Sequence, residues 1–446
     1  MPTLSKLHSR EVLDSRGQPT VEVEVWTDSG ARGRSIVPSG LSTGRHEAVE
    51  LRDCEHRRYG GRGVRRAVEN VRSEIASALR GWDLEDQAGI DAKLIELDGT
   101  PDRSRLGANA LVGVSMAVAE ATAEARGEEL YEHLHRLWID RFTPSDRERI
   151  DPGPGLPVPM VNMISGGRHA GGQLDFQDFL IVPTGVQCYS DALEVSASVY
   201  RSLGAILKDF IEESALVSDG GGYRPRLRTN QSAVDRILEA VLACGLKMGE
   251  DVCVALDVAA SAFFDPERQT YRLTAIGDDE LDSAEMVLLL EHWAKQYPIV
   301  SIEDGLAADD WDGWVELTAR LGVTMQLVGD DLFTTQASRI QRGIDRKAAN
   351  AVLIKPNQAG TLSETLDAIL LARRHGFRTI LSARSGETED TSIADLAVAV
   401  GASQIKIGSV ARSERLAKYN RLLRIEEHLG GPEVARFYAW KAPECE

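Results

Sequence analysis

Five charged residues stand just past the ends of short apolar runs in the second half of the chain. They are three carboxylates followed by two lysines, Asp257, Glu303, Asp330, Lys355 and Lys406, with Ala383 at the equivalent place between the lysines. From Glu303 onward these positions are about one βα unit apart. In a barrel of parallel strands they would all lie at the carboxyl-terminal face, where barrel enzymes keep their chemistry.

Such a cluster predicts proton abstraction assisted by a metal ion. Three convergent carboxylates need a compensating cation, and their hard oxygen ligands suit Mg²⁺. A partly desolvated lysine near another cation has a lowered pKa and can act as a base. If Lys355 removes a proton next to a carboxylate, the metal and the second ammonium, on Lys406, stabilise the dianion that forms. The structural alternatives are a buried ion-pair network, whose desolvation offsets its attraction, and a Lys355 side chain that extends to the surface.

The elements that must position these residues are alternating strands and helices. Apolar runs of β type end at Val182, Leu256, Ile302, Val328, Ile354, Leu381 and Ile405. Amphipathic helical stretches, such as Ser283 to Gln296 and Leu362 to His375, separate most of these runs. The alternation predicts an α/β fold with a (β/α)8-type TIM barrel. No glycine-rich nucleotide turn stands between a strand and a helix, which argues against an open doubly wound sheet.

A separate α+β domain precedes the barrel. Thr20 to Trp26 alternates apolar and polar residues, and a turn at Asp28 to Gly30 leads to a second strand that ends near Val37, which predicts a hairpin. Helical patterns follow at Gly63 to Leu79 and at Leu106 to Leu134. We expect a capping domain over residues 1–140, a polar and Pro/Gly-rich linker over 141–158, and the barrel over 159–446.

Composition excludes several function classes. The formal net charge is -18, which argues against broad binding to nucleic acid or to anionic membranes. The five cysteines are scattered without a C-x-x-C pair, as expected for reduced thiols in a cytoplasmic protein. Met1 to Asp14 carries charges throughout and has no apolar core of an export signal, and no apolar run is long enough to span a membrane. An anionic substrate would need local cations or metal to recruit it.

The motifs of the chain resemble those of the enolase family over nearly its full length. The matching segments are Asp14-Ser-Arg-Gly17, Val37-Pro-Ser-Gly with Ser42-Thr-Gly44, Leu106-Gly-Ala-Asn-Ala110, Gly166-Gly with His169-Ala-Gly171, Ala255-Leu-Asp-Val-Ala-Ala260, Ser301-Ile-Glu-Asp304, Val328-Gly-Asp-Asp331, Lys355, Arg384-Ser-Gly-Glu-Thr-Glu-Asp390 and Ala411-Arg-Ser-Glu-Arg-Leu-Ala-Lys-Tyr-Asn420. Enolase-type sites use a lysine or histidine base with one or two Mg²⁺ ions. The resemblance implies a capping domain, a modified barrel, a homo-oligomer and Mg²⁺ as the cofactor, with two ions expected.

The resemblance also assigns roles to residues. It implies that Asp257, Glu303 and Asp330 are metal ligands and that Ser39 ligates a second Mg²⁺. Lys355 matches the base, Lys406 the lysine that binds the substrate carboxylate, and Arg384 with Ser385 the phosphate contacts. The loop from Ser39 to Gly44 and the loop carrying His169 are implied to close over the substrate.

Three departures from the family pattern lie on the side of the leaving group. The usual Asp-Glu-Gly-Gly motif, whose glutamate helps to protonate the departing hydroxyl, reads Asp219-Gly-Gly-Gly222, so Gly220 has no proton to give. The Gln-Glu-Phe motif reads Gln177-Asp-Phe179, which leaves the shorter Asp178 as an acid beside the substrate-binding Gln177. The usual histidine of Ser-His-Arg-Ser-Gly is Ala383. A general acid is typically worth about 10²–10⁴ in rate, so its loss predicts altered specificity.

Three arginines add to these departures. Arg45, Arg168 and Arg224 stand in or beside the closing loops and the Asp219 segment. With the volume freed at Gly220 and Ala383, they predict a substrate larger or more anionic than 2-phosphoglycerate. The leading hypothesis is therefore dehydration of 2-phosphoglycerate or of a phosphorus-modified relative such as 2-carboxyphosphonoglycerate, as in phosphinate natural-product biosynthesis. The alternatives are an epimerase or isomerase with the same base and metal, and a non-catalytic binding protein.

Overall fold

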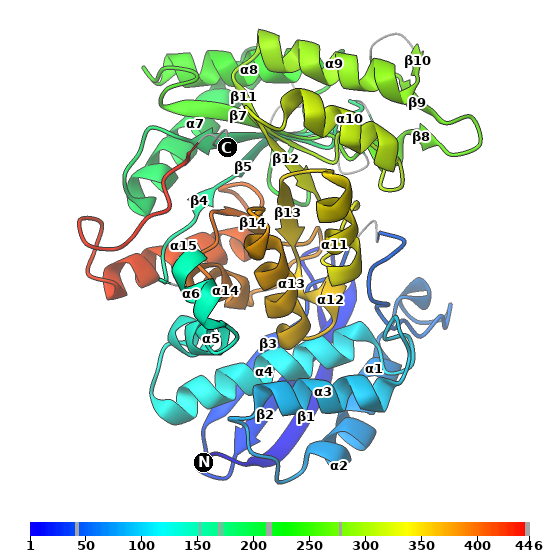
Figure 1. The fold of residues 1–446 in the computed structure, drawn as a ribbon, viewed down its shortest axis with the longest axis vertical. Helices are drawn as coiled ribbons and strands as arrows, with labels where there is room; N and C mark the ends of the chain where they lie inside the picture. The colour runs from blue at the N-terminus through cyan, green and yellow to red at the C-terminus, as the bar shows by residue number, and fades with distance from the viewer. Residues whose placement is uncertain are drawn as a thin grey trace.

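The computed structural model describes residues 1–40, 44–150, 153–167, 171–172, 174–210, 216–275 and 279–441. Figure 1 shows an amino-terminal cap at one end of the molecule and a larger barrel domain above it. Among the described residues, none of the helices combines the length and the apolar character needed to cross a membrane.

The cap is a three-stranded antiparallel sheet covered by helices. The sheet has the order β1-β2-β3, and its strands are Leu4–Leu13, Pro19–Thr27 and Arg32–Ile36. The hairpin predicted from the alternating residues is β2 and β3. The strand β1 has no such alternation, because its apolar residues are few and most of its side chains are partly exposed. It was therefore not expected from the sequence.

Helices of the cap pack on one face of this sheet. They are α1 (Arg65–Asn70), a π-helical stretch (Val71–Ile75), α2 (Ala76–Leu79), α3 (Gln87–Asp98), α4 (Ala108–Arg126) and α5 (Leu130–Ile139), after a single 3-10 turn (Tyr59–Gly61). The prediction of one helix over Leu106 to Leu134 is wrong, because the chain leaves the helix at Gly127, whose φ is 66°. Small residues let α4 lie close to the sheet: a Cβ added to Gly33 would stand 2.1 Å from the Ala117 carbonyl oxygen.

The barrel domain is built on one continuous sheet. Its strand order is β4-β15-β14-β13-β12-β11-β7-β6-β5. The strands are β4 (Val158–Pro159), β5 (Val161–Ser165), β6 (Asp178–Pro183), β7 (Val252–Asp257), β11 (Ile299–Glu303), β12 (Gln326–Gly329), β13 (Ala351–Ile354), β14 (Arg378–Ser382) and β15 (Gln404–Lys406). Only Met160 separates β4 from β5, so the two ends of this order are adjacent in the chain and the sheet closes on itself.

One strand of the barrel runs against the others. The strand β6 pairs antiparallel with both β5 and β7, whereas β7 and β11 to β15 pair in parallel. The first residue of β6 therefore lies at the same end of the barrel as the last residues of its neighbours. Helices α7 (Tyr189–Phe210), α8 (Asn230–Ala243), α9 (Ser283–Gln296), α10 (Trp311–Leu321), α11 (Ala337–Arg346), α13 (Leu362–Arg374), α14 (Ser392–Ala399) and α15 (Ser413–His428) belong to this domain.

The remaining elements are short. Between β7 and α9 the chain forms a single helical turn (Ala260–Ala262) and a small antiparallel sheet of β8 (Phe264–Asp265), β9 (Thr270–Leu273) and β10 (Asp279–Leu281). These inserted elements explain why Asp257 and Glu303 are farther apart in the sequence than the other predicted strand-end residues. Helix α12 (Pro356–Ala359) follows Lys355, and α6 (Pro144–Arg149) lies within the expected linker. The boundaries predicted for the two domains stay predictions.

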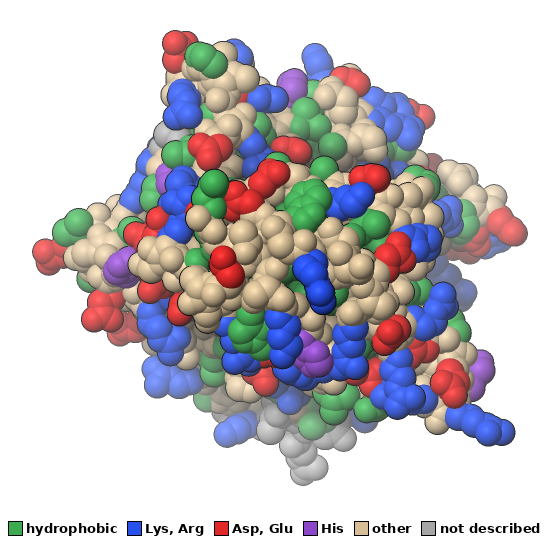
Figure 2. Space-filling view, turned by 90° about the horizontal axis from the view of Figure 1, so that it is seen from below, with side chains coloured by type: hydrophobic (Ala, Val, Ile, Leu, Met, Phe, Trp, Pro, Cys, Tyr) green, Lys and Arg blue, Asp and Glu red, His purple; other side chains and the backbone are tan. Residues whose placement is uncertain are grey.

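The surface of the cap end carries charges of both signs. Figure 2 shows this end with Lys and Arg interspersed among Asp and Glu. No single basic stripe dominates the face in this view, which fits the acidic net charge of the whole chain.

Candidate active site

The carboxyl-terminal ends of the barrel strands bring the five predicted charged residues together. Neighbouring strands are in register there: Glu303 lies beside Asp257, and Lys406 lies beside Ser382. Lys355 follows directly after β13, whose last residue is paired with Leu381 of β14. Strands in parallel register end at one level, so their terminal side chains form one ring at the mouth of the barrel.

Each of the two lysines contacts a different part of the carboxylate cluster. The Lys406 Nζ donates to Asp257 Oδ2 at 2.6 Å and to both Glu303 carboxylate oxygens at 2.7 Å. The Lys355 Nζ donates to Asp330 Oδ2 at 2.6 Å. Both lysine side chains are only 12% exposed. Lys355 therefore does not extend into solvent.

The electrostatics of the cluster show an excess of negative charge. Burial and the neighbouring Asp257 raise the pKa of Glu303 to about 8. Burial alone would lower the pKa of Lys406, but the carboxylates of Asp257 and Glu303 outweigh burial and raise this pKa. Burial alone would raise the pKa of the Asp330 carboxyl, but the Lys355 ammonium outweighs burial and lowers this pKa. A carboxyl that resists ionisation beside two ammonium groups fits a site with room for a further cation.

A second group of carboxylates adjoins the first. Among the described residues, Asp304, Asp330 and Asp331 offer oxygens within 4.8 Å of one another. Burial and Asp330 raise the pKa of Asp331 to about 7. Asp304 has a positioning role, because its carboxylate accepts the backbone N–H groups of Asp330 at 3.0 Å and Asp331 at 2.8 Å. Buried oxygen donors of this kind fit Mg²⁺. Of the three predicted ligands only Asp330 belongs to this group, whereas Asp257 and Glu303 contact Lys406, so the full set Asp257, Glu303 and Asp330 stays a prediction.

Asp178 enters the site because β6 is reversed. It is the first residue of its strand and is paired with Asp257 in the ladder. Its Oδ1 accepts hydrogen bonds from Asn162 Nδ2 at 2.6 Å and from Ser165 Oγ at 2.8 Å. The preceding residue, Gln177, donates from Nε2 to Asp257 Oδ2 at 3.0 Å. The first two residues of the Gln177-Asp-Phe179 motif thus lie beside the cluster: Gln177 contacts Asp257, and the charge of Asp178 acts on Lys406.

Arg384 is held by the cap and by the segment after β13. Its guanidinium donates to Glu47 Oε2 and to Asn357 Oδ1, each at 2.9 Å. Glu47 in turn accepts from the Gly44 backbone N–H at 2.7 Å, so this carboxylate joins the amino-terminal loop to the barrel. The neighbouring Ser385 accepts from Arg16 of the cap at 3.3 Å. Arg384 and Ser385 both line the cavity at the mouth of the barrel, and their role as phosphate contacts stays a prediction.

The structure gives Ser39 protein partners, and its assignment as a ligand of a second Mg²⁺ stays a prediction. Ser39 is fully buried. Its Oγ donates to Asp14 Oδ2 at 2.7 Å and accepts from Arg16 Nη2 at 2.9 Å, and its backbone pairs with Gly386 in both directions. The backbone of Ser39 therefore ties the cap to the barrel, and its side chain is held by two residues of the cap. The other serine of the same loop, Ser42, lies outside the described residues.

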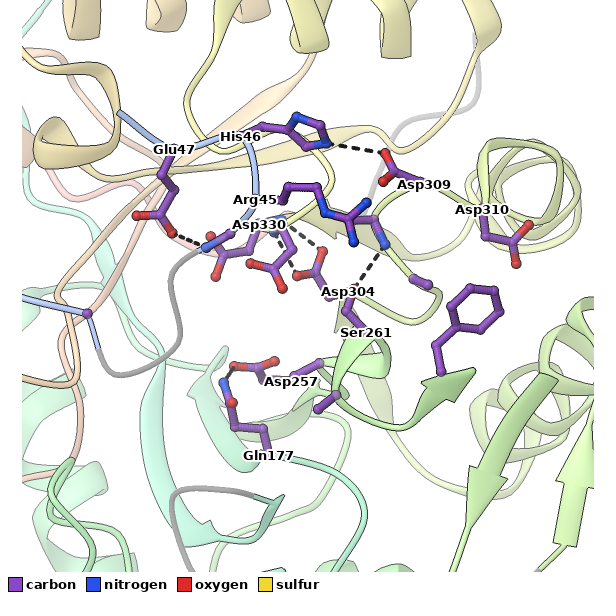
Figure 3. A pocket seen from close by; sticks show the side chains of 18 of the residues that line it. Arg45, His46, Glu47, Gln177, Asp257, Ser261, Asp304, Asp309, Asp310 and Asp330 are labelled. Atoms are coloured by element: carbon purple, nitrogen blue, oxygen red, sulfur yellow. Dashed lines mark hydrogen bonds and ion pairs between the residues drawn. The ribbon is translucent and has the colours of Figure 1, made fainter. Parts of the chain in front are cut away.

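The three arginines that depart from the family pattern differ in their relation to the cavity. Arg45 is exposed and lines the cavity, and Figure 3 shows its side chain across the mouth near Asp330. Arg224 is exposed and is absent from the lining of both cavities at the site, so its role stays a prediction. Arg168 and His169 lie outside the described residues, and so do residues 41–43 of the loop from Ser39 to Gly44.

The cavity itself has a volume of about 530 Å³. Figure 3 shows Asp257, Asp304 and Asp330 along its floor and His46 on the opposite side, where His46 Nε2 lies 3.4 Å from Asp309 Oδ1. A smaller adjoining cavity of about 90 Å³ lies beside Gly220 and Ala383. It is also bordered by Asp178 and Lys406.

Several residues of the site were not predicted from the sequence. They are Glu47, Asn162, Ser165, Asp304, Asp331 and Gln358, whose Nε2 bridges Glu47 and Asp330. The sequence does indicate two of them, Asp304 and Asp331. Each directly follows a predicted ligand at a strand end, in the segments Ser301-Ile-Glu-Asp304 and Val328-Gly-Asp-Asp331. The others come from segments whose contact with the barrel mouth depends on tertiary structure.

Comparison with known protein families agrees with this geometry. The model of the enolase C-terminal TIM barrel domain matches residues 154–442, and the model of the enolase N-terminal domain matches residues 4–134. The two matches coincide with the barrel and the cap seen in the structure. The chain belongs to the enolase family.

Proposed function

We propose that this protein is a Mg²⁺-dependent lyase that removes the proton next to a carboxylate and expels a β-hydroxyl as water, giving an enolpyruvate. The observation that supports this most directly is the placement of Lys355 and Lys406 around Asp257, Glu303 and Asp330 at the mouth of the barrel. A base, a second cation and a cluster of oxygen ligands are thereby held together at the carboxyl-terminal ends of the strands.

The two lysines have different roles in the proposed reaction. Lys355 is the base that takes the proton from carbon 2 of the substrate, and its contact with Asp330 fixes its position. Lys406 is held by two carboxylates and provides a fixed positive charge for the substrate carboxylate. When bound, Mg²⁺ supplies further positive charge next to the carboxylate on which negative charge develops.

The substrate that we propose is 2-phosphoglycerate or a relative modified at phosphorus, such as 2-carboxyphosphonoglycerate. Arg384 and Ser385 support a phosphate or phosphonate group at the cavity wall. Arg45 supports an additional anionic group, because it stands at the mouth and makes no ion pair with any described residue. A cavity of about 530 Å³ has room for more than a three-carbon acid.

The test is to incubate the purified protein with Mg²⁺ and each candidate substrate, and to follow the absorbance of the enolpyruvate product. We expect the phosphorus-modified substrate to react faster than 2-phosphoglycerate. Lys355→Ala should abolish the reaction, whereas Lys247→Ala, which removes an exposed lysine paired with Glu250, should not. Turnover of 2-phosphoglycerate at ordinary enolase rates would refute altered specificity, and no turnover of either compound would refute the lyase.

A second candidate function is an epimerase or isomerase. The absence of a side chain at Gly220 favours it, because proton abstraction would then not be followed by loss of the hydroxyl. This function predicts that the proton on carbon 2 exchanges with solvent, or that the configuration there changes, without formation of an enolpyruvate.

A further inference from the structure

The two predicted phosphate contacts, Arg384 and Ser385, lie on an irregular segment of the chain. The segment from Arg384 to Thr388 comes just after β14 and forms neither a helix nor a named strand. Arg384 and Ser385 line both cavities at the site, and we call them the phosphate subsite. An irregular segment presents two side chains in a fixed geometry only where other parts of the chain hold its backbone.

Helix α15 holds this segment through two buried cations. Arg415 and Lys418 are three residues apart on the helix, so they lie on one face of it, and they are 2% and 0% exposed. Lys418 Nζ donates to the Thr388 carbonyl oxygen and forms an ion pair with Glu387 Oε2, each at 2.6 Å. Glu387 Oε1 accepts the backbone N–H of Arg384 at 2.9 Å. Lys418 therefore supports the start of the segment through Glu387.

Arg415 holds the phosphate subsite directly. Its Nη1 donates to the Arg384 carbonyl oxygen at 2.7 Å, and its Nη2 donates to the Ser385 carbonyl oxygen at 2.8 Å. A longer contact of 3.5 Å joins Nη2 to the Asp219 carbonyl oxygen. One planar guanidinium thus bonds two successive peptide units, which is a geometry that the single ammonium group of a lysine does not match.

Charge pairing does not account for an arginine at this position. Within the described part of the chain, Arg384 and Lys418 form ion pairs with Glu47 and Glu387, whereas Arg415 forms none, and its Nε has no hydrogen-bond partner there. A buried guanidinium without a carboxylate partner is costly to desolvate. What Arg415 contributes is its pair of bonds to the backbone of the phosphate subsite.

We propose that Arg415 is the positioning residue of the phosphate subsite, holding the backbone of Arg384 and Ser385 so that their side chains converge on the phosphorus group of the substrate. This inference rests on the part of the proposed function in which Arg384 and Ser385 bind that group. Arg415 acts through these two residues. A displacement of about 1 Å at such a site can cost about 10² in rate or affinity.

Inorganic phosphate is the probe for the subsite, because its binding requires neither the base nor turnover. Arg415→Met removes both carbonyl contacts and keeps an unbranched side chain. We expect the dissociation constant for phosphate, measured by isothermal titration calorimetry, to rise by about 10² in this variant. Arg415→Lys keeps the charge but not the two-pronged contact, so its dissociation constant should rise by about 10.

Two further measurements separate positioning from a general loss of structure. The affinity for Mg²⁺ should be parental in both variants, because Arg415 contacts none of the predicted metal ligands. With 2-phosphoglycerate, exchange of the carbon 2 proton by Arg415→Lys should show a raised KM and a rate at saturation within a few-fold of the parent. A loss of folded protein alone would lower this rate and leave KM unchanged.

Arg373→Met is the matched control. The Arg373 guanidinium also donates to a backbone carbonyl, that of Gly401 at 2.5 Å, but the residue lines neither cavity at the site. Its loss should lower stability and leave the affinity for phosphate unchanged.

The proposal is wrong if either Arg415 variant binds phosphate with parental affinity, or if Mg²⁺ affinity falls as much as phosphate affinity. If Arg415→Met does not fold, Arg415→Lys decides between these results. A parent protein that binds no phosphate, or binds it away from Arg384 and Ser385 in a crystal structure, would refute the phosphate contacts of the proposed function and this inference with them. Phosphate binding by the parent without proton exchange would refute the proposed reaction, and the phosphate titrations would still decide the role of Arg415.

Discussion

Two residues of the amino-terminal loop show how a side chain's contacts decide its role. Ser39 has both hydrogen-bonding capacities of its hydroxyl satisfied by Asp14 and Arg16 inside the interface between cap and barrel. Glu47, a few positions later, bridges the loop to Arg384. The loop thus carries a structural serine and a carboxylate that orients a predicted phosphate contact.

Ser39→Ala distinguishes the contacts of Ser39 in the structure from its predicted role as a metal ligand. The substitution leaves Asp14 and Arg16 without one partner each, so we expect the free energy of unfolding to fall by about 1–3 kcal/mol. If these two partners keep the hydroxyl, the affinity for Mg²⁺ should not change. Urea unfolding and a Mg²⁺ titration measure the two effects.

The control is Asp330→Asn, which removes charge from a predicted ligand and should weaken Mg²⁺ binding. If Ser39→Ala weakened Mg²⁺ binding with unchanged stability, the assignment of Ser39 to the interface would be wrong.

At the scale of elements, strand direction decided what the sequence could predict. The ends of the parallel strands were evident from apolar runs, and they placed Asp257, Glu303, Lys355 and Lys406 correctly at one face of the barrel. The run ending at Val182 gave no such information, because β6 is reversed and presents its first residue, Asp178, to the site. Pairing direction is set by contacts between strands and leaves little trace in a single run of residues.

Polar and charged residues explain why some strands of the structure were not predicted from the sequence. The strand β1 is held by pairing with β2 rather than by an apolar face, and the small sheet of β8 to β10 has mostly partly exposed residues. Only β9 among these strands alternates buried and exposed residues, and its four residues are too few for the period-two pattern by which strands are recognised. Glu47, Asn162 and Gln358 could not be predicted as site residues, because their positions depend on how loops of the cap and barrel meet.

Helix α4 provides a prediction about pH. Glu120 on this helix accepts the backbone N–H of Arg34, and burial raises its pKa to about 7. A carboxyl with a raised pKa binds its proton in the folded state at pH values where the unfolded chain has lost it. The free energy of unfolding should therefore decrease as the pH rises from about 4.5 to about 7.

Glu120→Gln isolates this effect. The variant keeps the shape of the side chain but has no proton to lose, so it should have a smaller decrease in stability over this pH range than the parent. Urea unfolding at a series of pH values measures the difference. Identical slopes for variant and parent would show that Glu120 does not titrate with a raised pKa.

The whole molecule places a small cap over a barrel whose mouth contains the charges. The cap contributes Glu47, Arg45 and the serine that anchors it, and the barrel contributes the lysines and carboxylates. Membership of the enolase family accounts for this division. Lys355 and the predicted ligands follow the family pattern, whereas Gly220, Asp178 and Ala383 depart from it and line the smaller adjoining cavity.

The central claim is that Lys355 removes a proton from carbon 2 of a carboxylate substrate. Its most direct test is to follow, by NMR in deuterated buffer with Mg²⁺, the exchange of that proton in 2-phosphoglycerate. We predict exchange with the parent protein and with Lys247→Ala, and a loss of at least about 10² in rate with Lys355→Ala. Exchange at the parental rate in Lys355→Ala would contradict the claim.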